Sequence, residues 1–215
     1  MKLKRVYEKG FTLIEMVIAL VIVGLLASLV IFSYDGSKSK AQALVALMEE
    51  YGGAMQRIKA DGSCYPKKMT GLFDLGEATG AAGSFCGADL SKQWNGPYVK
   101  PANATALGSI KLGNIAPEAE LSITRTESTY NGSATPTYKW YIVAYNIPSE
   151  ITTQALLQCN GSDSANAGGG AASTKCSSDQ TTLASTVGTS VQGSAVTALG
   201  GELHTFDLMF DETRR

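Results

Sequence analysis

The feature that most constrains this chain is a short basic segment followed by a long apolar run. Residues 1–10 carry four basic side chains and one acidic side chain, and the apolar run extends from Phe11 to Phe32. A helix rises 1.5 Å per residue and needs about 20 apolar residues to cross the hydrocarbon core of a bilayer. The run therefore predicts a membrane-spanning helix with its basic end on the cytoplasmic side.

Two simpler interpretations of this run are a secretory signal and a plain membrane anchor. A secretory signal is cut at small residues after its apolar part, but Ala27-Ser28 lies inside the run. A plain anchor leaves Glu15 unexplained, because an acid in an apolar span costs about 2–3 kcal/mol and is usually paired or functional. We expect no residue of the same helix to neutralise Glu15. Cleavage after Gly10 would create an α-amine on Phe11 that could pair with Glu15 of another copy.

The segment Gly10-Phe11-Thr12-Leu13-Ile14-Glu15, between the basic leader and the apolar run, resembles the prepilin signature of the type IV pilin and pseudopilin family. This resemblance implies that a membrane prepilin peptidase cleaves between Gly10 and Phe11 and then N-methylates Phe11. It also implies that Glu15 sets the axial register by pairing with the α-amine of an adjoining subunit. The chain departs from many family members in having no proline within residues 29–34.

The resemblance implies a structural function. The precursor would sit in the bacterial inner membrane with its N-terminus in the cytoplasm. An inner-membrane assembly platform would then polymerise it with copies of itself and with related minor pilins. Our first hypothesis is a type IV pilus subunit serving adhesion, motility or DNA uptake, and the second is a pseudopilin of a type II protein secretion system. A third, of another class, is a membrane-anchored periplasmic domain, which leaves Glu15 without a role.

Charge and side-chain chemistry narrow the functional classes. The chain has 18 basic and 19 acidic residues, so its bulk charge gives no indication of nucleic-acid binding. His204 is the only histidine, and no serine or cysteine pattern accompanies it. We therefore expect no catalytic site, metal or cofactor. Three glycosylation sequons begin at Asn103, Asn131 and Asn160, but such short motifs often arise by chance.

The helix is expected to continue beyond the membrane. We assign residues 1–10 to the leader, 11–34 to the transmembrane or filament-core helix, and 35–61 to its amphipathic continuation, so that one helix would run from residue 11 to about residue 60. The continuation has an apolar stripe at helical spacing, formed by Leu44, Met48, Tyr51, Met55 and Ile58. Gly52-Gly53 indicates a bend or a close approach to a neighbour, of which we expect the close approach. Gly62 is expected to end the helix.

Residues 62–215 are expected to form a globular head. Alternation and β-branched residues predict strands at 121–126, 138–146 and 203–210. A short helix should begin at Ser149 as its cap and end near Asn160-Gly161. Trp94–Val99 reads as a turn between aromatic anchors. The expected fold class is α+β and pilin-like, with a long N-terminal helix that is half transmembrane and half packed on a small antiparallel sheet.

The four cysteines, Cys64, Cys86, Cys159 and Cys176, allow three pairings into two disulfides. We expect Cys64 to pair with Cys86 and Cys159 with Cys176. The second disulfide would close a Gly-, Ser- and Ala-rich loop, which is worth about 3 kcal/mol in the chain-entropy model. Members of the pilin family often have a disulfide-bounded C-terminal loop, and in a filament such a loop would face outward.

Overall fold

The computed structural model describes residues 12–32, 36–129, 136–161, 175–178, 190–192 and 203–214. They fall into two compact units, Met1–Gly36 and Ser37–Arg215, and each is described by itself. The first unit contains α1 (Leu13–Phe32), and α2 (Gly36–Gly62) lies along the second unit, which we call the head. The helix expected from residue 11 to about residue 60 is thus seen as α1 and α2, while residues 33–35 lie outside the described residues.

Helix α2 buries the apolar stripe that its spacing predicts. Leu44, Met48, Met55 and Ile58 are at most 1% exposed and belong to the core of the head. The helix runs uninterrupted through Gly52 and Gly53. A Cβ atom on Gly52 would lie 3.0 Å from the Cβ of Phe210, so this glycine lets α2 approach the last strand of the head closely. The expected close approach is therefore present at Gly52.

The end of α2 differs from the expectation in one respect. Gly62 is its last residue, but the left-handed conformation that follows belongs to Ser63, whose φ is 58°. The Ser63 amide donates to the Lys59 carbonyl and closes the final turn. Gly62 is instead needed for packing, because a Cβ there would lie 2.7 Å from Cδ2 of buried Leu90.

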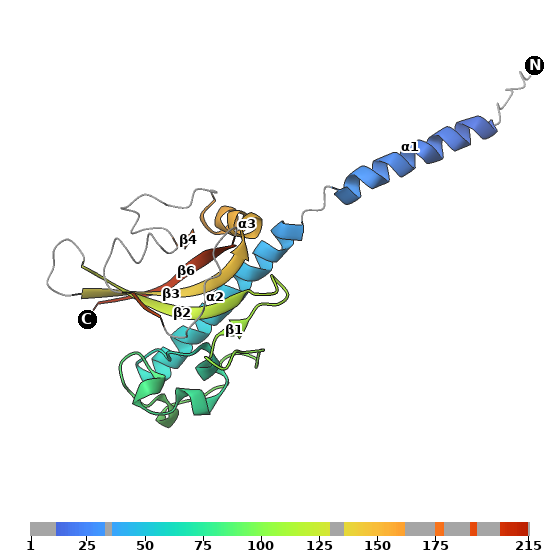
Figure 1. Cartoon of the computed structure of the whole chain (residues 1–215). Helices are drawn as coiled ribbons and strands as arrows, with labels where there is room; N and C mark the ends of the chain where they lie inside the picture. The colour runs from blue at the N-terminus through green and yellow to red at the C-terminus, as the bar shows by residue number, and fades with distance from the viewer. Residues whose placement is uncertain are drawn as a thin grey trace, which may run out of the picture. The chain divides into compact units, whose positions relative to one another are not determined.

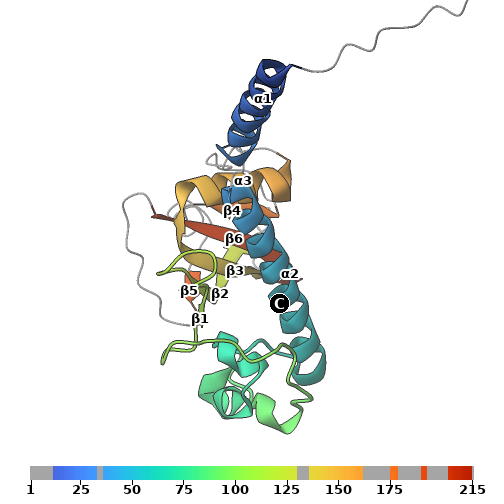
Figure 2. The same cartoon turned by 90° about the vertical axis from the view of Figure 1, so that its right-hand side faces the viewer.

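The sheet of the head is antiparallel at every pairing in the described residues. Its order is β1-β2-β3-β6-β4, and β5 pairs with β2 beside β1. The strands are β1 (Ile110–Lys111), β2 (Glu120–Thr129), β3 (Pro136–Pro148), β4 (Cys176–Ser178), β5 (Ser190–Gln192) and β6 (Leu203–Arg214). Figures 1 and 2 show α2 lying along one face of this sheet. The fold class is α+β, and the three predicted strands correspond to β2, β3 and β6.

The short helix of the head, α3 (Ser149–Asn160), contacts β3, β4 and β6. Its C-terminal end agrees with the prediction, since Gly161 is left-handed with a φ of 74°. Its start does not, because Pro148 occupies the N-cap position and no side chain caps the helix. Proline fixes the backbone where the helix begins, so Ser149 becomes the first helical residue and its carbonyl accepts a hydrogen bond from the Thr153 hydroxyl.

Residues 63–108 form a compact layer beyond the end of α2. Four short 3₁₀ helices lie here, at Met69–Leu72, Leu75–Ala78, Ala81–Gly83 and Leu90–Lys92. The aromatic anchors expected around residues 94–99 are present: the Trp94 indole donates to the Gly71 carbonyl, and its ring meets the edge of Tyr98 at a centroid distance of 5.8 Å. The Tyr98 hydroxyl donates to Asp61 at 2.6 Å, which ties this layer to α2.

Candidate functional site

The first turn of α1 is held by a reciprocal pair of side chains. The amide and the hydroxyl of Thr12 each donate to Oε2 of Glu15 at 2.9 Å. The Glu15 amide in turn donates to the Thr12 hydroxyl oxygen at 3.4 Å. This is a capping box, in which a threonine before the helix and an acid three residues later satisfy each other's main-chain groups. The pair fixes where the Glu15 carboxylate lies at the start of the apolar helix.

Sequence reasoning missed this role. It took Glu15 to have no partner within its own helix, yet Thr12 supplies two hydrogen bonds. The signal was readable, since a threonine followed three residues later by a glutamate, before an apolar run, is the sequence signature of a capping box. Thr12 is nonetheless uncharged, so the hydrogen bonds hold the carboxylate in place without neutralising its negative charge.

Both Thr12 donors use one oxygen of the carboxylate. Within the described residues, the other oxygen, Oε1, accepts no hydrogen bond, and Glu15 forms no ion pair. An ionised carboxylate can accept about four hydrogen bonds, so Glu15 retains capacity for a cationic donor. Gly10 and Phe11, where cleavage and methylation are predicted, lie outside the described residues.

The surface of α1 is unusually apolar for a helix exposed to solvent. Between Leu13 and Val23, nine large hydrophobic side chains are about half exposed or more, and Leu13 and Leu20 reach 83% and 70%. Apolar area of this extent on one element marks a surface that another apolar environment normally covers. In the described part of the chain, no helix meets the length and hydropathy requirements for crossing a bilayer.

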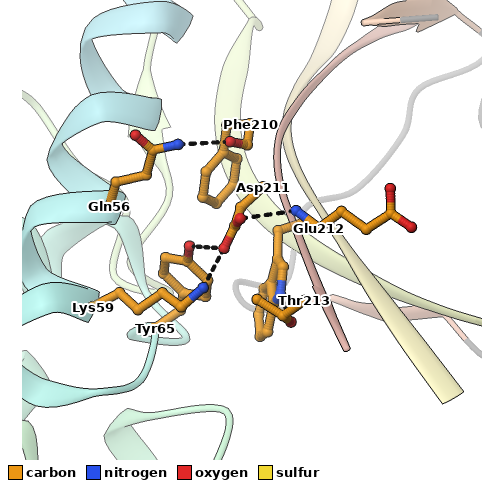
Figure 3. A network of polar contacts seen from close by, with 8 residues as sticks. Gln56, Lys59, Tyr65, Phe210, Asp211, Glu212 and Thr213 are labelled. Carbon is orange, nitrogen blue, oxygen red and sulfur yellow. Dashed lines mark hydrogen bonds and ion pairs between the residues drawn. The ribbon is translucent and has the colours of Figure 1, made fainter. Parts of the chain in front are cut away.

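The head has a second polar constellation, which joins α2 to the end of the chain (Figure 3). Lys59 forms an ion pair with Asp211, and the Tyr65 hydroxyl donates to the same carboxylate oxygen. The Gln56 side chain donates to the Phe210 carbonyl at 2.8 Å. We call Gln56, Lys59, Tyr65 and Asp211 the α2–β6 clamp.

A β-bulge in β6 orients two consecutive residues of this strand toward α2. Trp140 of β3 pairs with Asp211 and Tyr141 pairs with Met209, which leaves Phe210 as the extra residue. As a result, Phe210 and Asp211 both face α2, although neighbours on a regular strand face opposite sides. No spacing rule in the sequence reveals such a bulge.

Electrostatics keep the clamp charged. Burial alone would raise the pKa of Asp211, but hydrogen bonds from Lys59 and Tyr65 and the Lys59 charge outweigh burial and hold this pKa below its usual range. The pKa of Tyr65 is raised by burial and by its hydrogen bond to Asp211. The clamp is therefore a carboxylate that stays ionised next to a phenol that stays neutral. It holds no unpaired nucleophile or base.

The structure joins Cys64 to Cys86 and Cys159 to Cys176, the two pairings expected from the sequence. Next to the second disulfide, the Asn160 amide holds both main-chain groups of Cys176: its Nδ2 donates to the carbonyl at 2.7 Å and its Oδ1 accepts from the amide at 3.2 Å. Since both ends of this side chain are engaged, Asn160 is poorly placed to accept a glycan. Asn103 is exposed, and Asn131 lies outside the described residues.

His204 lies on β6, where it pairs with Ile147 of β3. In the described residues, no group of three or more His, Cys, Asp or Glu side chains could hold a metal ion. Of the residues singled out in the sequence, the structure joins the four cysteines in two disulfides, and it places Glu15 in the first turn of α1.

Comparison with known proteins identifies the N-terminal segment. Residues 5–31 match the family model described as the prokaryotic N-terminal methylation motif. This match contains the capping box and Glu15. The chain carries the N-terminal segment of the pilin and pseudopilin family.

Curated proteins similar to this chain include the type II secretion system core protein G of three bacteria. The Klebsiella pneumoniae protein is 41% identical over 76 residues, which cover 34% of this chain and 54% of the relative. The Escherichia coli (strain K12) protein is 40% identical over 73 residues, 33% of this chain and 50% of the relative. The Pectobacterium carotovorum protein is 39% identical over 67 residues, which cover 30% of this chain and 43% of the relative. This chain spans about half the length of the relatives it matches. No solved structure gives a significant match.

Proposed function

We propose that this chain is a structural subunit of a helical filament, made as an inner-membrane precursor with one transmembrane segment. The observation that carries the proposal is the Glu15 carboxylate, which is fixed by Thr12 and leaves Oε1 open at the start of an exposed apolar helix. This site lies inside the segment that matches the methylation motif.

Processing would precede assembly. A prepilin peptidase would cut between Gly10 and Phe11 and methylate the new N-terminus at Phe11. The basic leader would hold the N-terminus of the precursor in the cytoplasm, because positively charged flanks stay on that side. Helix α1 would lie in the bilayer until the subunit is extracted, and the head would lie in the periplasm.

Assembly would then bury α1 among other copies. The nine exposed apolar side chains of α1 would pack in a bundle, and the Glu15 carboxylate would accept the charged α-amine of Phe11 from an adjoining subunit. In a low-dielectric bundle each charge relieves the cost of burying the other. A contact between two different surfaces of identical subunits generates an open fibre, not a closed ring.

The relatives favour a pseudopilin of a type II protein secretion system over a type IV pilus subunit, since core protein G of that system is what the chain matches. The pilus remains a second candidate because the match covers only about a third of the chain. The head also has a C-terminal segment bounded by the Cys159–Cys176 disulfide, as pilins often do. Deleting the gene separates the two: loss of secreted enzymes supports the pseudopilus, and loss of surface filaments with normal secretion supports the pilus.

Glu15→Gln is the variant that tests the filament proposal. Glutamine at this position still completes a capping box but carries no charge. We expect normal cleavage and a normal start of α1, with at least a tenfold loss of filaments. Glu50→Gln, which removes an exposed acid from α2, is the matched control and should assemble normally. Wild-type filament yield from Glu15→Gln would overturn the register role.

A further inference from the structure

Arg125 lies on β2 inside a cage of three aromatic rings. The centre of its guanidinium is 4.4 Å from the Tyr138 ring, 5.6 Å from the Phe85 ring and 5.8 Å from the Trp140 ring. Tyr138 and Trp140 belong to the neighbouring strand β3, and Phe85 precedes the disulfide cysteine Cys86. Three rings from two parts of the head thus hold the guanidinium, and favourable cation–π contacts lower its freedom to move.

The charge of Arg125 is unmatched in the described residues. No ion pair there includes it, and no hydrogen bond there uses its terminal nitrogens. Its Nε is buried and has no hydrogen-bond partner. Glu127 lies two residues further along β2, yet no ion pair joins the two. Lys59, the other described cation that lies over an aromatic ring, differs from Arg125 because it forms an ion pair with Asp211.

We propose that Arg125 is the anchor of an oxyanion-binding site that takes a carboxylate or a phosphate group. A guanidinium recognises such groups through two parallel N–H donors, and this recognition is strongest when the fork is fixed in advance, as the three rings fix it here. Because Nε is buried, the ligand must approach the two terminal nitrogens end-on. Unlike Nε, the two terminal nitrogens of this half-buried residue are not among the fully buried unpartnered atoms of the described residues, so a ligand can reach them.

Two sources supply this chemistry. One is an acidic side chain of a second copy of this chain, which would bring its carboxylate to Arg125 when heads meet in the proposed filament. The other is a free phosphate or phosphorylated metabolite that binds the isolated subunit. Burying an unpaired guanidinium is strongly unfavourable, so a neighbouring head that covers Arg125 must bring an anion to it. The site itself does not depend on the filament proposal; only the first source does.

The site is tested on the full chain in detergent by comparing its melting temperature in sodium phosphate and in sodium chloride at equal ionic strength. A ligand that binds the folded state raises the melting temperature, and above its Kd this rise grows with the logarithm of the ligand concentration. We expect phosphate to raise the melting temperature of the wild type. This rise should disappear in Arg125→Gln, and it should shrink in Arg125→Lys, which keeps the charge but lacks the two parallel N–H donors. Lys139→Gln is the matched control, since Lys139 stands between Tyr138 and Trp140 but faces the other side of the sheet. Phosphate should raise the melting temperature of Lys139→Gln as much as that of the wild type.

The outcomes are distinct. An equal phosphate response in Arg125→Lys, or no response of the wild type beyond chloride, would overturn the site. If Arg125→Gln does not fold, the comparison of Arg125→Lys with the wild type is sufficient to test the site.

To distinguish the two sources of the anion, filament yield is measured for Arg125→Lys and Lys139→Gln. A several-fold loss confined to Arg125→Lys identifies a neighbouring copy as the source. Normal yield together with a reduced phosphate response identifies the free anion. Failure of Glu15→Gln to show a defect would instead count against the filament and would leave the phosphate result intact.

Discussion

Thr12 donates both its amide and its hydroxyl to a single carboxylate oxygen of Glu15. The same acid thus has two tasks: it completes the first turn of α1, and its open oxygen remains available to another molecule. A charge fixed in this way needs little reorganisation when a partner arrives. The two tasks can be separated by substitution, because the first needs a hydrogen-bond acceptor and the second needs a negative charge.

Thr12→Ala should weaken the start of α1. It removes the hydroxyl that accepts from the Glu15 amide, and loss of such a cap costs about 1 kcal/mol. Thr12→Ser keeps the hydroxyl and is the matched control. Amide hydrogen exchange of the full chain in detergent micelles measures the effect, and protection of the Glu15 and Met16 amides, which both bond to Thr12, should fall several-fold in Thr12→Ala only. Equal protection in both variants would mean that the capping box does not stabilise the helix.

Ser63→Gly should stabilise the head. Ser63 holds a φ of 58°, which glycine adopts without steric cost. Relief of this strain is worth about 0.5–1 kcal/mol and should raise the melting temperature by a few degrees. The neighbouring Gly62→Ala should do the opposite, because its Cβ would collide with Leu90, which is 1% exposed. If both substitutions lower the melting temperature, the assignment of the left-handed position to Ser63 is wrong.

Asp211→Asn should destabilise the attachment of β6 to α2. It weakens the ion pair with Lys59 and the hydrogen bond from Tyr65, with an expected cost of about 1–2 kcal/mol given that the side chains are partly exposed. Because the pKa of Asp211 is held down in the folded state, this contribution is present above the ordinary pKa of aspartate and is lost as pH falls below it. Urea unfolding at neutral and acidic pH measures the cost of the substitution and its dependence on pH. A double-mutant cycle with Tyr65→Phe should show coupling, and strict additivity would contradict a shared network.

Alkaline pH should destabilise the head, because burial raises the pKa values of Tyr65, Tyr141 and Tyr145. Burial and the charge of Asp207 raise the pKa of Tyr141 to about 12. Burial also raises the pKa of Tyr145 to about 12, although a hydrogen bond with Thr124 acts to lower it. An unfolded tyrosine ionises near pH 10, so between about pH 10 and 12 the unfolded state loses protons that the folded state keeps. Stability should therefore fall over this window. Unfolding free energy against pH is the measurement, and Tyr141→Phe should flatten the slope. A constant free energy across the window would contradict the burial of both phenols.

Periodic features of the fold were predictable, and local irregularities were not. The stripe from Leu44 to Ile58 and the strands β2, β3 and β6 follow from spacings that one buried face imposes on helices and strands. The strands β1, β4 and β5 have only two or three residues each, too few to create a pattern, and they form because a longer neighbour offers an edge. The left-handed Ser63 and the bulge at Phe210 likewise depend on what packs around them.

In the candidate site too, some features could be predicted from the sequence and others could not. The acid at position 15 stands out in an apolar run, so its importance follows from the cost of burying a charge. Its hydrogen bonds to Thr12 also have a sequence signature, because a threonine followed three residues later by a glutamate before an apolar run indicates a capping box. The aromatic cage of Arg125 could not be anticipated. Phe85 and Tyr138 are far apart in the sequence and meet only through the Cys64–Cys86 connection and the pairing of β2 with β3.

The mass of the mature N-terminal peptide shows whether the chain is cleaved after Gly10 and methylated at Phe11, as the pairing of Glu15 with an α-amine requires. The protein is isolated from its native host without a tag at the N-terminus, digested, and analysed by tandem mass spectrometry. We expect a chain that begins at Phe11 and carries one methyl group on its α-amine. A mature protein that begins at Met1, or just after Ala27, would remove the amine that Glu15 is proposed to bind and would contradict the account.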